Sequence, residues 1–160
     1  MSVLAIPGLM CTPSVFSRLS PAISSPVRVI ELPVADTVSE IASRILDAAP
    51  ARFILLGLSM GSYLCFELYR QASSQIKGMV LLSASAQADT KEAAAMRDKV
   101  SNWAMRSGIP ALSATVADNL LSVQSRSDEG LRNEIAARAG DFGIEAFCTH
   151  QRAIRDRPDS

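Results

Sequence analysis

The sequence contains few of the residues that build metal centres or disulfide frameworks. It has one histidine and three cysteines among 160 residues, and Cys11, Cys65 and Cys148 lie far apart. These positions lack the spacing of a metal-binding motif, so we expect no metal site. Scattered thiols are typical of reduced cysteines, because disulfides persist mainly in oxidising compartments. The cysteine pattern therefore predicts a cytoplasmic protein.

Charge and hydropathy argue against two classes of partner. Lysine plus arginine and aspartate plus glutamate each number 16, so the formal net charge is zero. No basic block indicates a nucleic-acid-binding surface. No apolar run approaches the ~20 residues that a membrane-spanning helix needs. We therefore expect neither nucleic acid nor membrane as a partner. We also expect no cofactor, because the turn after residues 3–6 lacks the G-x-G-x-x-G of a dinucleotide site.

Four short apolar runs alternate with helical patterns in the first half of the sequence. They lie at residues 3–6, 27–32, 53–56 and 79–82. Such alternation predicts an α/β fold, with a parallel sheet of about four strands and flanking helices. A helical stripe follows the second run, and Thr37 with Glu40 predicts a capped start for it.

The runs differ in charge, and the chain changes character after the last one. Residues 27–32 carry charges, as an edge strand does. Residues 79–82 carry none, which is typical of a strand buried on both faces with neighbours on both sides. Only helical patterns follow, with a break at Gly108 and Pro110. We therefore divide the chain into a core at 1–87 and a helical unit at 88–160.

The most informative motif is Gly-Leu-Ser-Met-Gly at residues 57–61, between a predicted strand and a predicted helix. G-x-S-x-G in this context is the nucleophile elbow, a sharp turn that holds the serine in a strained backbone conformation. A Cβ at either flanking glycine would collide with neighbouring backbone. The turn exposes the Ser59 hydroxyl, and the helix start supplies free N–H groups for a developing negative charge. An ordinary strand-to-helix turn is the alternative.

With this motif, the sequence resembles the α/β-hydrolase family over its whole length, and most of all a bacterial subgroup of small esterase-like and enol-lactonase-like members. Residues 3–9, Val-Leu-Ala-Ile-Pro-Gly-Leu, look like the strand and loop where most members carry His-Gly. The resemblance implies that Ser59 is the nucleophile. It also implies that the backbone N–H groups of Leu9 and Met60 form the oxyanion hole. Residues 88–160 look like the subgroup's helical lid. Ser62 replaces a glycine that is usual after the motif, and we expect it to crowd the helix start.

The family's catalytic acid and histidine lie on two further strands, and the resemblance stops before them. A serine hydroxyl needs a base that an acid orients. His150 is a candidate base, although we favour a packing role in the lid. Asp89 is a candidate acid, although we favour a role at the start of the lid. We therefore expect a C-terminally truncated chain with weak activity or none. A fragment, an early-terminated gene product and a protein that has lost catalysis all stay open.

The leading functional prediction is a serine hydrolase that cleaves an ester, thioester or lactone through an acyl-enzyme on Ser59. Cleavage of a carbon–carbon bond stays open, because a fold does not fix a function. The main alternative is a non-catalytic hydrolase-like module that binds a small acyl ligand or a protein partner. An acyltransferase or a patatin-like enzyme fits less well, because the glycine-rich early loop of patatin-like proteins is missing. We also expect a homo-oligomer through the exposed edge of residues 79–82, since the strands that cover it in the family are absent.

Overall fold

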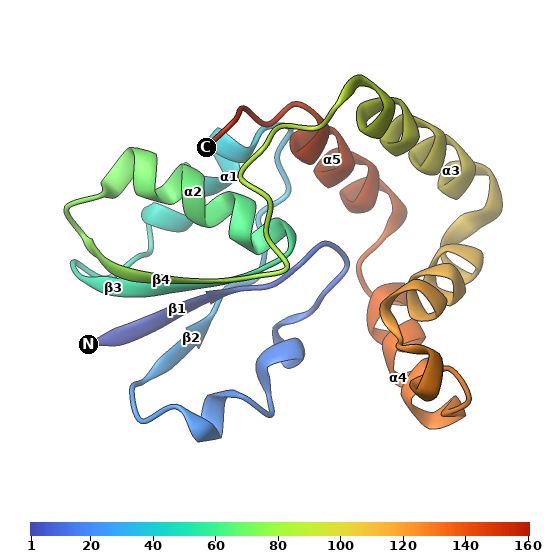
Figure 1. Ribbon diagram of the computed structural model, residues 1–160, viewed down its shortest axis with the longest axis horizontal. Helices are drawn as coiled ribbons and strands as arrows, with labels where there is room; N and C mark the ends of the chain where they lie inside the picture. The colour runs from blue at the N-terminus through green and yellow to red at the C-terminus, as the bar shows by residue number, and fades with distance from the viewer.

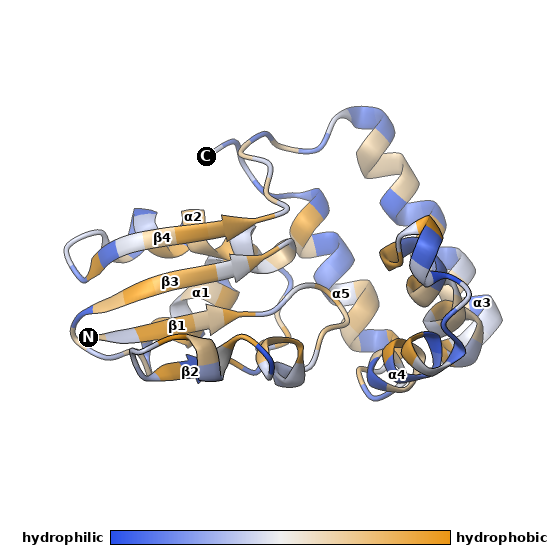
Figure 2. Cartoon of the chain, turned by 60° about the horizontal axis from the view of Figure 1, so that its bottom comes forward, coloured by the Kyte–Doolittle hydropathy of each residue, from blue (hydrophilic) through white to orange (hydrophobic). Residues whose placement is uncertain are grey.

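A parallel sheet forms one half of the molecule, and helices form the other (Figure 1). The structure is a computed structural model that describes residues 1–160, apart from the side chain of Ser20. The strand order in the described chain is β2-β1-β3-β4, as Figure 2 shows. The strands are β1 (Ser2–Ile6), β2 (Val27–Val29), β3 (Phe53–Leu58) and β4 (Ile76–Leu82). The predicted α/β fold with about four parallel strands is confirmed.

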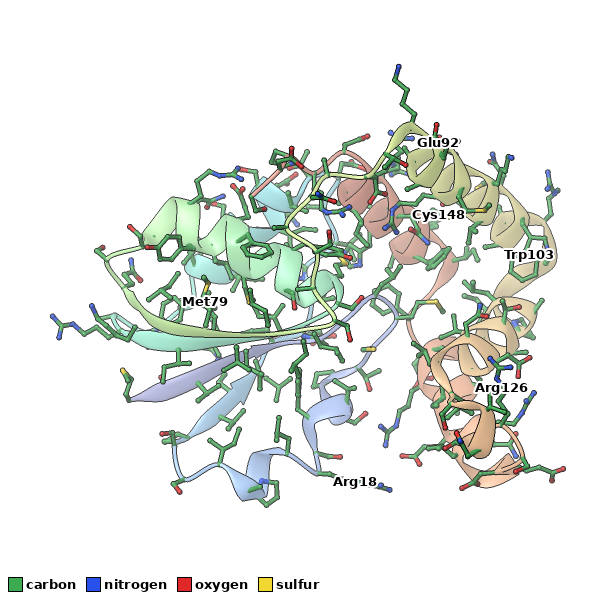
Figure 3. The ribbon with its side chains drawn as sticks, viewed as in Figure 1. Arg18, Met79, Glu92, Trp103, Arg126 and Cys148 are labelled. Carbon is green, nitrogen blue, oxygen red and sulfur yellow. The ribbon has the colours of Figure 1, made fainter. Side chains whose placement is uncertain are left out.

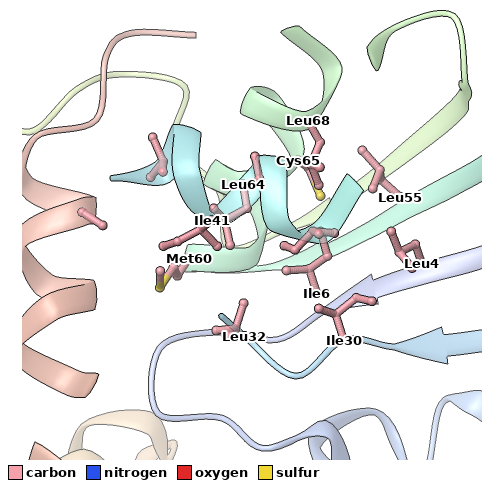
Figure 4. Close-up of a cluster of buried hydrophobic side chains, with 14 of the residues drawn as sticks. Leu4, Ile6, Ile30, Leu32, Ile41, Leu55, Met60, Leu64, Cys65 and Leu68 are labelled. Carbon is pink, nitrogen blue, oxygen red and sulfur yellow. The ribbon is translucent and has the colours of Figure 1, made fainter. Parts of the chain in front are cut away.

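Helices α1 (Val38–Leu46) and α2 (Met60–Ala72) bury one face of the sheet (Figure 1). The predicted helix start at Thr37 is confirmed, because its hydroxyl accepts a hydrogen bond from the Glu40 N–H at 3.1 Å. Apolar side chains of the sheet and both helices form the main core (Figure 4). Alternate residues of β1 point to opposite faces, so Leu4 joins this core while Val3 joins a smaller one.

The smaller core lies on the opposite face of the sheet. There Phe16, from the 3₁₀ helix η1 (Pro13–Phe16), packs in one cluster with Val3 and Leu56. A second 3₁₀ helix, η2 (Ser20–Ala22), follows before the chain enters β2. Both faces of the central strands are therefore covered, which fits their nearly continuous apolar sequences.

The helical unit contains α3 (Lys91–Leu120), η3 (Val123–Ser125), α4 (Glu129–Gly140) and α5 (Ile144–Arg155). The predicted break in α3 is confirmed, because Gly108 has φ 78° and ψ 173° and separates two helical halves. Within the described residues, no helix is both long and apolar enough to cross a membrane. The division that we predicted at residues 87 and 88 falls in the connection between β4 and α3.

Helix α5 connects the two halves of the molecule (Figure 1). Ala153 and Ile154, near its end, belong to the main core. Phe147 and Cys148, one to two turns earlier, belong to a separate lid core with α3 and α4. Cys148 on α5 points toward α3, and its Sγ lies 3.8 Å from the Ser101 carbonyl oxygen (Figure 3).

An ion cluster fixes the connection to the lid. The Asp89 carboxylate, whose side chain is 5% exposed, accepts hydrogen bonds from Arg97 and from Arg157, the latter at 2.5 Å. The Arg157 guanidinium also lies 4.2 Å from the centre of the Tyr63 ring and donates to the Gln87 carbonyl. Asp89 thus ties the start of α3 to the segment after α5, and Arg157 connects that segment to α2.

Strand β4 has the exposed edge that we predicted for residues 79–82, but not the predicted burial of its faces. It is the last strand of the sheet and pairs with β3 alone among the described strands. Met79, Val80 and Leu82 are 37%, 48% and 39% exposed, and Figure 3 labels the first of them. The expectation that residues 79–82 are buried on both faces is therefore wrong for this chain, because no described strand lies beyond them. Strand β2 occupies the other edge, as predicted.

We predict that the chain self-associates through β4, because its outer edge has unpaired backbone groups and its side chains include exposed apolar ones. Light scattering at high micromolar concentration should give a mass above the 17.1 kDa monomer. Val80→Lys adds a charge to the strand and should shift the mass towards the monomer. Met96→Lys, at a 56% exposed position on α3, is the matched control and should not. A clean wild-type monomer would contradict the prediction.

Candidate active site

Ser59 lies at a sharp bend between the end of β3 and the start of α2. Its backbone has φ 52° and ψ −113°, in a region that residues with a side chain rarely adopt. A Cβ added to Gly57 would lie 2.6 Å from the Gly61 carbonyl oxygen. A Cβ added to Gly61 would lie 2.0 Å from the Ile6 carbonyl oxygen. The predicted collisions are confirmed, so this bend requires glycine on both sides.

Hydrogen bonds to β4 hold the bend in place. The Ser59 N–H donates to the Leu82 carbonyl at 2.8 Å. The fully buried Ser62 hydroxyl lies 2.8 Å from the Gly57 carbonyl oxygen and 3.1 Å from that of Leu82. Two acceptors thus share its single proton. Ser62 therefore anchors the start of α2, and the crowding that we expected from it is not observed.

A cavity of about 570 Å³ opens beside Ser59, between the sheet and the lid. Its walls are mostly apolar, and the lid contributes most of them. The Ser59 side chain is half-buried and makes no hydrogen bond among the described residues. The residues that line the cavity are Leu9, Met10, Ser59, Lys99, Val100, Trp103, Leu112, Thr115, Val116, Asn119, Leu120, Phe147 and Gln151. As predicted, Ser59 lies at a strained bend with access to a cavity.

The loop after β1 passes directly beside this bend. A Cβ added to Gly8 would lie 3.4 Å from the Ser59 Cβ. The Cys11 N–H donates to the Gly8 carbonyl at 3.1 Å and closes a turn, inside which Met10 has φ 58°. Within the described chain, the N–H groups of Leu9 and Met60 donate to no backbone carbonyl outside the regular elements. That both point to one site near Ser59 stays a prediction.

His150 is a buried packing residue. It is 0% exposed, its ring centre lies 5.4 Å from that of Phe142, and it does not line the cavity. Its Nε2 lies 2.8 Å from the Pro33 carbonyl oxygen. A carbonyl only accepts, so Nε2 carries the proton and Nδ1 is left without a partner among the described residues. Burial lowers the pKa of His150 and keeps the ring neutral.

Asp89 is equally unavailable to Ser59, because it belongs to the ion cluster and does not line the cavity. Burial alone would raise the pKa of its carboxyl. The hydrogen bonds and charges of Arg97 and Arg157 outweigh this effect and hold the pKa below its usual value. The described lining of the cavity contains no histidine and no carboxylate. No group of metal-ligating side chains was found among the described residues either.

Sequence reasoning missed the lid residues that carry polar groups into the cavity. Lys99 and Asn119 belong to α3, and Gln151 belongs to α5. Trp103, the only tryptophan in the sequence, lines the same cavity. The sequence revealed the apolar stripes of the helices. It did not reveal which polar residues beside those stripes would line the cavity next to Ser59.

The chain is similar to known proteins in family and in fold. Residues 19–131, more than half of the chain, match the family described as alpha/beta hydrolase fold. One similar structure is a thermophilic esterase from Thermogutta terrifontis with malate bound. It shares 22% identity with a TM-score of 0.82 over 100% of this chain and 65% of that chain. Another is an enol-lactonase from Burkholderia xenovorans, with 18% identity and a TM-score of 0.86 over 99% of this chain and 66% of that chain.

A hydrolase from Pseudomonas aeruginosa is a third similar structure, with 18% identity and a TM-score of 0.82 over 98% of this chain and 65% of that chain. At such identities the likeness shows the fold. This chain spans slightly less than two thirds of the length of each of the three. The sequence matches none of the curated proteins with which it was compared.

We predict that Gly61→Ala unfolds the chain or costs it several kcal/mol of stability, because the new Cβ would lie 2.0 Å from the Ile6 carbonyl oxygen. Gly78→Ala is the control. No atom lies within 4 Å of a Cβ at that position, so its midpoint of urea unfolding should hold or rise slightly. Equal midpoints for the two variants would contradict the close approach of α2 to β1.

We predict that stability falls as the pH drops below about 6.5, the usual histidine pKa in an unfolded chain. Burial lowers the pKa of His150. Between the unfolded and the folded pKa, the ring is therefore protonated in the unfolded chain and neutral in the folded chain. The free energy of unfolding should therefore decrease by at most ~1.4 kcal/mol per pH unit until the folded pKa is reached.

The measurement is urea unfolding at a series of pH values from 7 to 5. His150 is the only histidine in the sequence, so the slope can be assigned to it. His150→Gln keeps an N–H donor for the Pro33 carbonyl and should flatten the slope. The same slope in both proteins would show that His150 is not the group responsible.

Proposed function

Because the chain belongs to the alpha/beta hydrolase family, we propose that it acts as a serine hydrolase on an ester, thioester or lactone, with Ser59 as the nucleophile. The single observation that carries the proposal is the position of Ser59. It lies at a strained strand-to-helix bend, and its side chain lines a cavity of about 570 Å³. A backbone with φ 52° persists only where the surrounding structure enforces it, and such strain is concentrated at functional sites.

In the proposed reaction, the Ser59 Oγ attacks the substrate carbonyl carbon and loses its proton to a base. The carbonyl oxygen becomes an oxyanion, which the N–H groups of Leu9 and Met60 stabilise. Collapse of the tetrahedral intermediate breaks the bond to the leaving oxygen or sulfur, which takes a proton from the base, and leaves an acyl-enzyme on Ser59. The alcohol or thiol of an ester or thioester departs, whereas the hydroxyl or enol of an opened lactone stays attached to the acyl group. Water then attacks this ester and releases the acid.

The cavity favours a substrate with an apolar acyl portion, because aliphatic and aromatic side chains form most of its wall. Relatives of similar fold are described as an esterase and an enol-lactonase, which supports acyl esters or lactones. The base is assigned to no described residue. His150 is packed in the protein with its Nε2–H on a backbone carbonyl, and Asp89 is held by two arginines.

We predict that a fluorophosphonate labels the 160-residue chain slowly, with one adduct per chain on Ser59. The bend and the free N–H groups favour attack, but no histidine or carboxylate lines the described cavity to accept the proton. Intact-mass spectrometry and peptide mapping measure the rate and the position. Turnover of an activated ester should be faint.

Ser59→Ala should abolish the adduct, and Ser83→Ala is the matched control. Ser83 also has a positive φ, of 53°, but it does not line the cavity, so its loss should leave labelling unchanged. Labelling that persists in Ser59→Ala would refute the proposed nucleophile. Brisk turnover that disappears in His150→Ala would identify His150 as the base and overturn its packing role.

A second function is a module that binds a small acyl ligand without cleaving it. The observation that favours it is the combination of a large apolar cavity with a lining that holds no described histidine or carboxylate. Saturable quenching of Trp103 by a fatty acid or its ester, without any covalent adduct at Ser59, would support this function over hydrolysis.

A further inference from the structure

The cavity beside Ser59 has an unbalanced charge. Lys99 is its only charged lining residue among those that the structure describes. Neighbouring arginines of the lid are paired with carboxylates, Arg97 with Asp89 and Arg155 with Asp98. Lys99 has no ion pair or hydrogen bond in the described chain and is exposed to solvent. The side chain of an unpaired lysine therefore contributes to the wall of a mostly apolar cavity.

Gln151 presents a second donor to the same cavity. Its side chain is largely buried, with the residue only 7% exposed, yet it lines the cavity. The Arg97 Nη1 donates to the Gln151 Oε1 at 2.8 Å, and Arg97 is itself held by Asp89. A guanidinium only donates, so the amide oxygen must face Arg97. The amide NH₂ of Gln151 is left without a partner among the described residues.

We propose that Lys99 and Gln151 bind the carboxylate of an anionic substrate, so that the cavity selects esters or lactones whose acyl portion carries a second, free carboxylate. The inference rests on the proposed function, because it names the substrate class of the same site. A carboxylate matches both donors, since it offers two acceptor oxygens and a negative charge that can pair with the Lys99 ammonium group.

In this proposal the sheet half of the molecule carries the reacting serine, and the lid carries the residues that bind the carboxylate. The bend after β3 presents Ser59 to the reacting carbonyl. Helices α3 and α5 of the lid present Lys99 and Gln151 to the carboxylate. The wall also contains apolar residues such as Leu112 and Phe147, which suit a hydrocarbon linker between the two ends of the substrate. Charge selection would then depend on the lid and not on the reacting centre.

Binding to the unreactive Ser59→Ala chain tests the inference without any turnover. Trp103 lines the cavity and is the only tryptophan, so its fluorescence reports occupancy. The two probes are monomethyl adipate, which carries one carboxylate, and the neutral dimethyl adipate. We expect the monoester to bind about tenfold more tightly than the diester, as a charge-assisted hydrogen bond in a partly apolar site provides. The preference should shrink as salt is raised, because salt screens exposed charges.

The variants separate the carboxylate contact from a general effect of charge. Lys99→Met should reduce the preference about tenfold and leave diester binding within twofold. Lys91→Met removes the same charge from the exposed start of α3, outside the cavity, and should leave the preference intact. Gln151→Met keeps the length of the side chain but removes its donor, and should weaken monoester binding several-fold. Thermal unfolding checks that each variant folds.

Three results would overturn the inference. They are equal binding of the two probes, no quenching by either, and the same response in Lys99→Met as in Lys91→Met. None of them bears on whether Ser59 reacts with a fluorophosphonate. Labelled Ser59 without a charge preference would refute this inference alone. A preference without labelling would support the carboxylate-binding cavity and refute the nucleophile.

Discussion

The close approach of α2 to the ends of β1 and β3 is the constraint on which the rest of the structure depends. Only hydrogen atoms fit at Gly57 and Gly61, where an added Cβ would lie 2.6 Å and 2.0 Å from backbone oxygen. This contact forces the chain through Ser59 with a positive φ and places its side chain beside the loop that follows β1. The Ser62 hydroxyl then ties the helix start to the ends of β3 and β4. The position of Ser59, its strained backbone and the access of its side chain to the cavity thus all follow from this close packing of α2.

A second dependence connects the lid to this bend. Met10 extends from the loop after β1 into the lid core, where it is 4% exposed and packs with Leu112 and Phe147. Its neighbour Leu9 contributes to the cavity wall and supplies one of the proposed oxyanion donors. Helix α5 makes the reverse connection, with Ile154 in the main core. Two of the elements that line the cavity, the loop after β1 and helix α5, therefore pack in both halves of the molecule.

Features encoded by neighbouring residues could be predicted from the sequence, whereas features set by distant contacts could not. The bend at Ser59, the cap at Thr37 and the break at Gly108 each depend on a few adjacent residues with distinctive backbone chemistry. The role of Gln151 depends on Arg97, which lies 54 positions away, and no local pattern reveals such a pairing. The exposure of β4 was misjudged because an uncharged run indicates apolar faces, while the number of neighbouring strands is a property of the whole sheet.

The buried thiol of Cys65 makes the packing of α2 against β3 accessible to a chemical measurement. A Cβ on Gly57 would lie 2.7 Å from the Cys65 Sγ, so the thiol lies directly beneath the bend. Burial leaves it 0% exposed and raises its pKa to about 12, and the thiolate that alkylating reagents attack is almost absent at neutral pH. A reagent reaches this sulfur only when α2 separates from β3. The rate at which this one cysteine is alkylated therefore reports how often the bend opens.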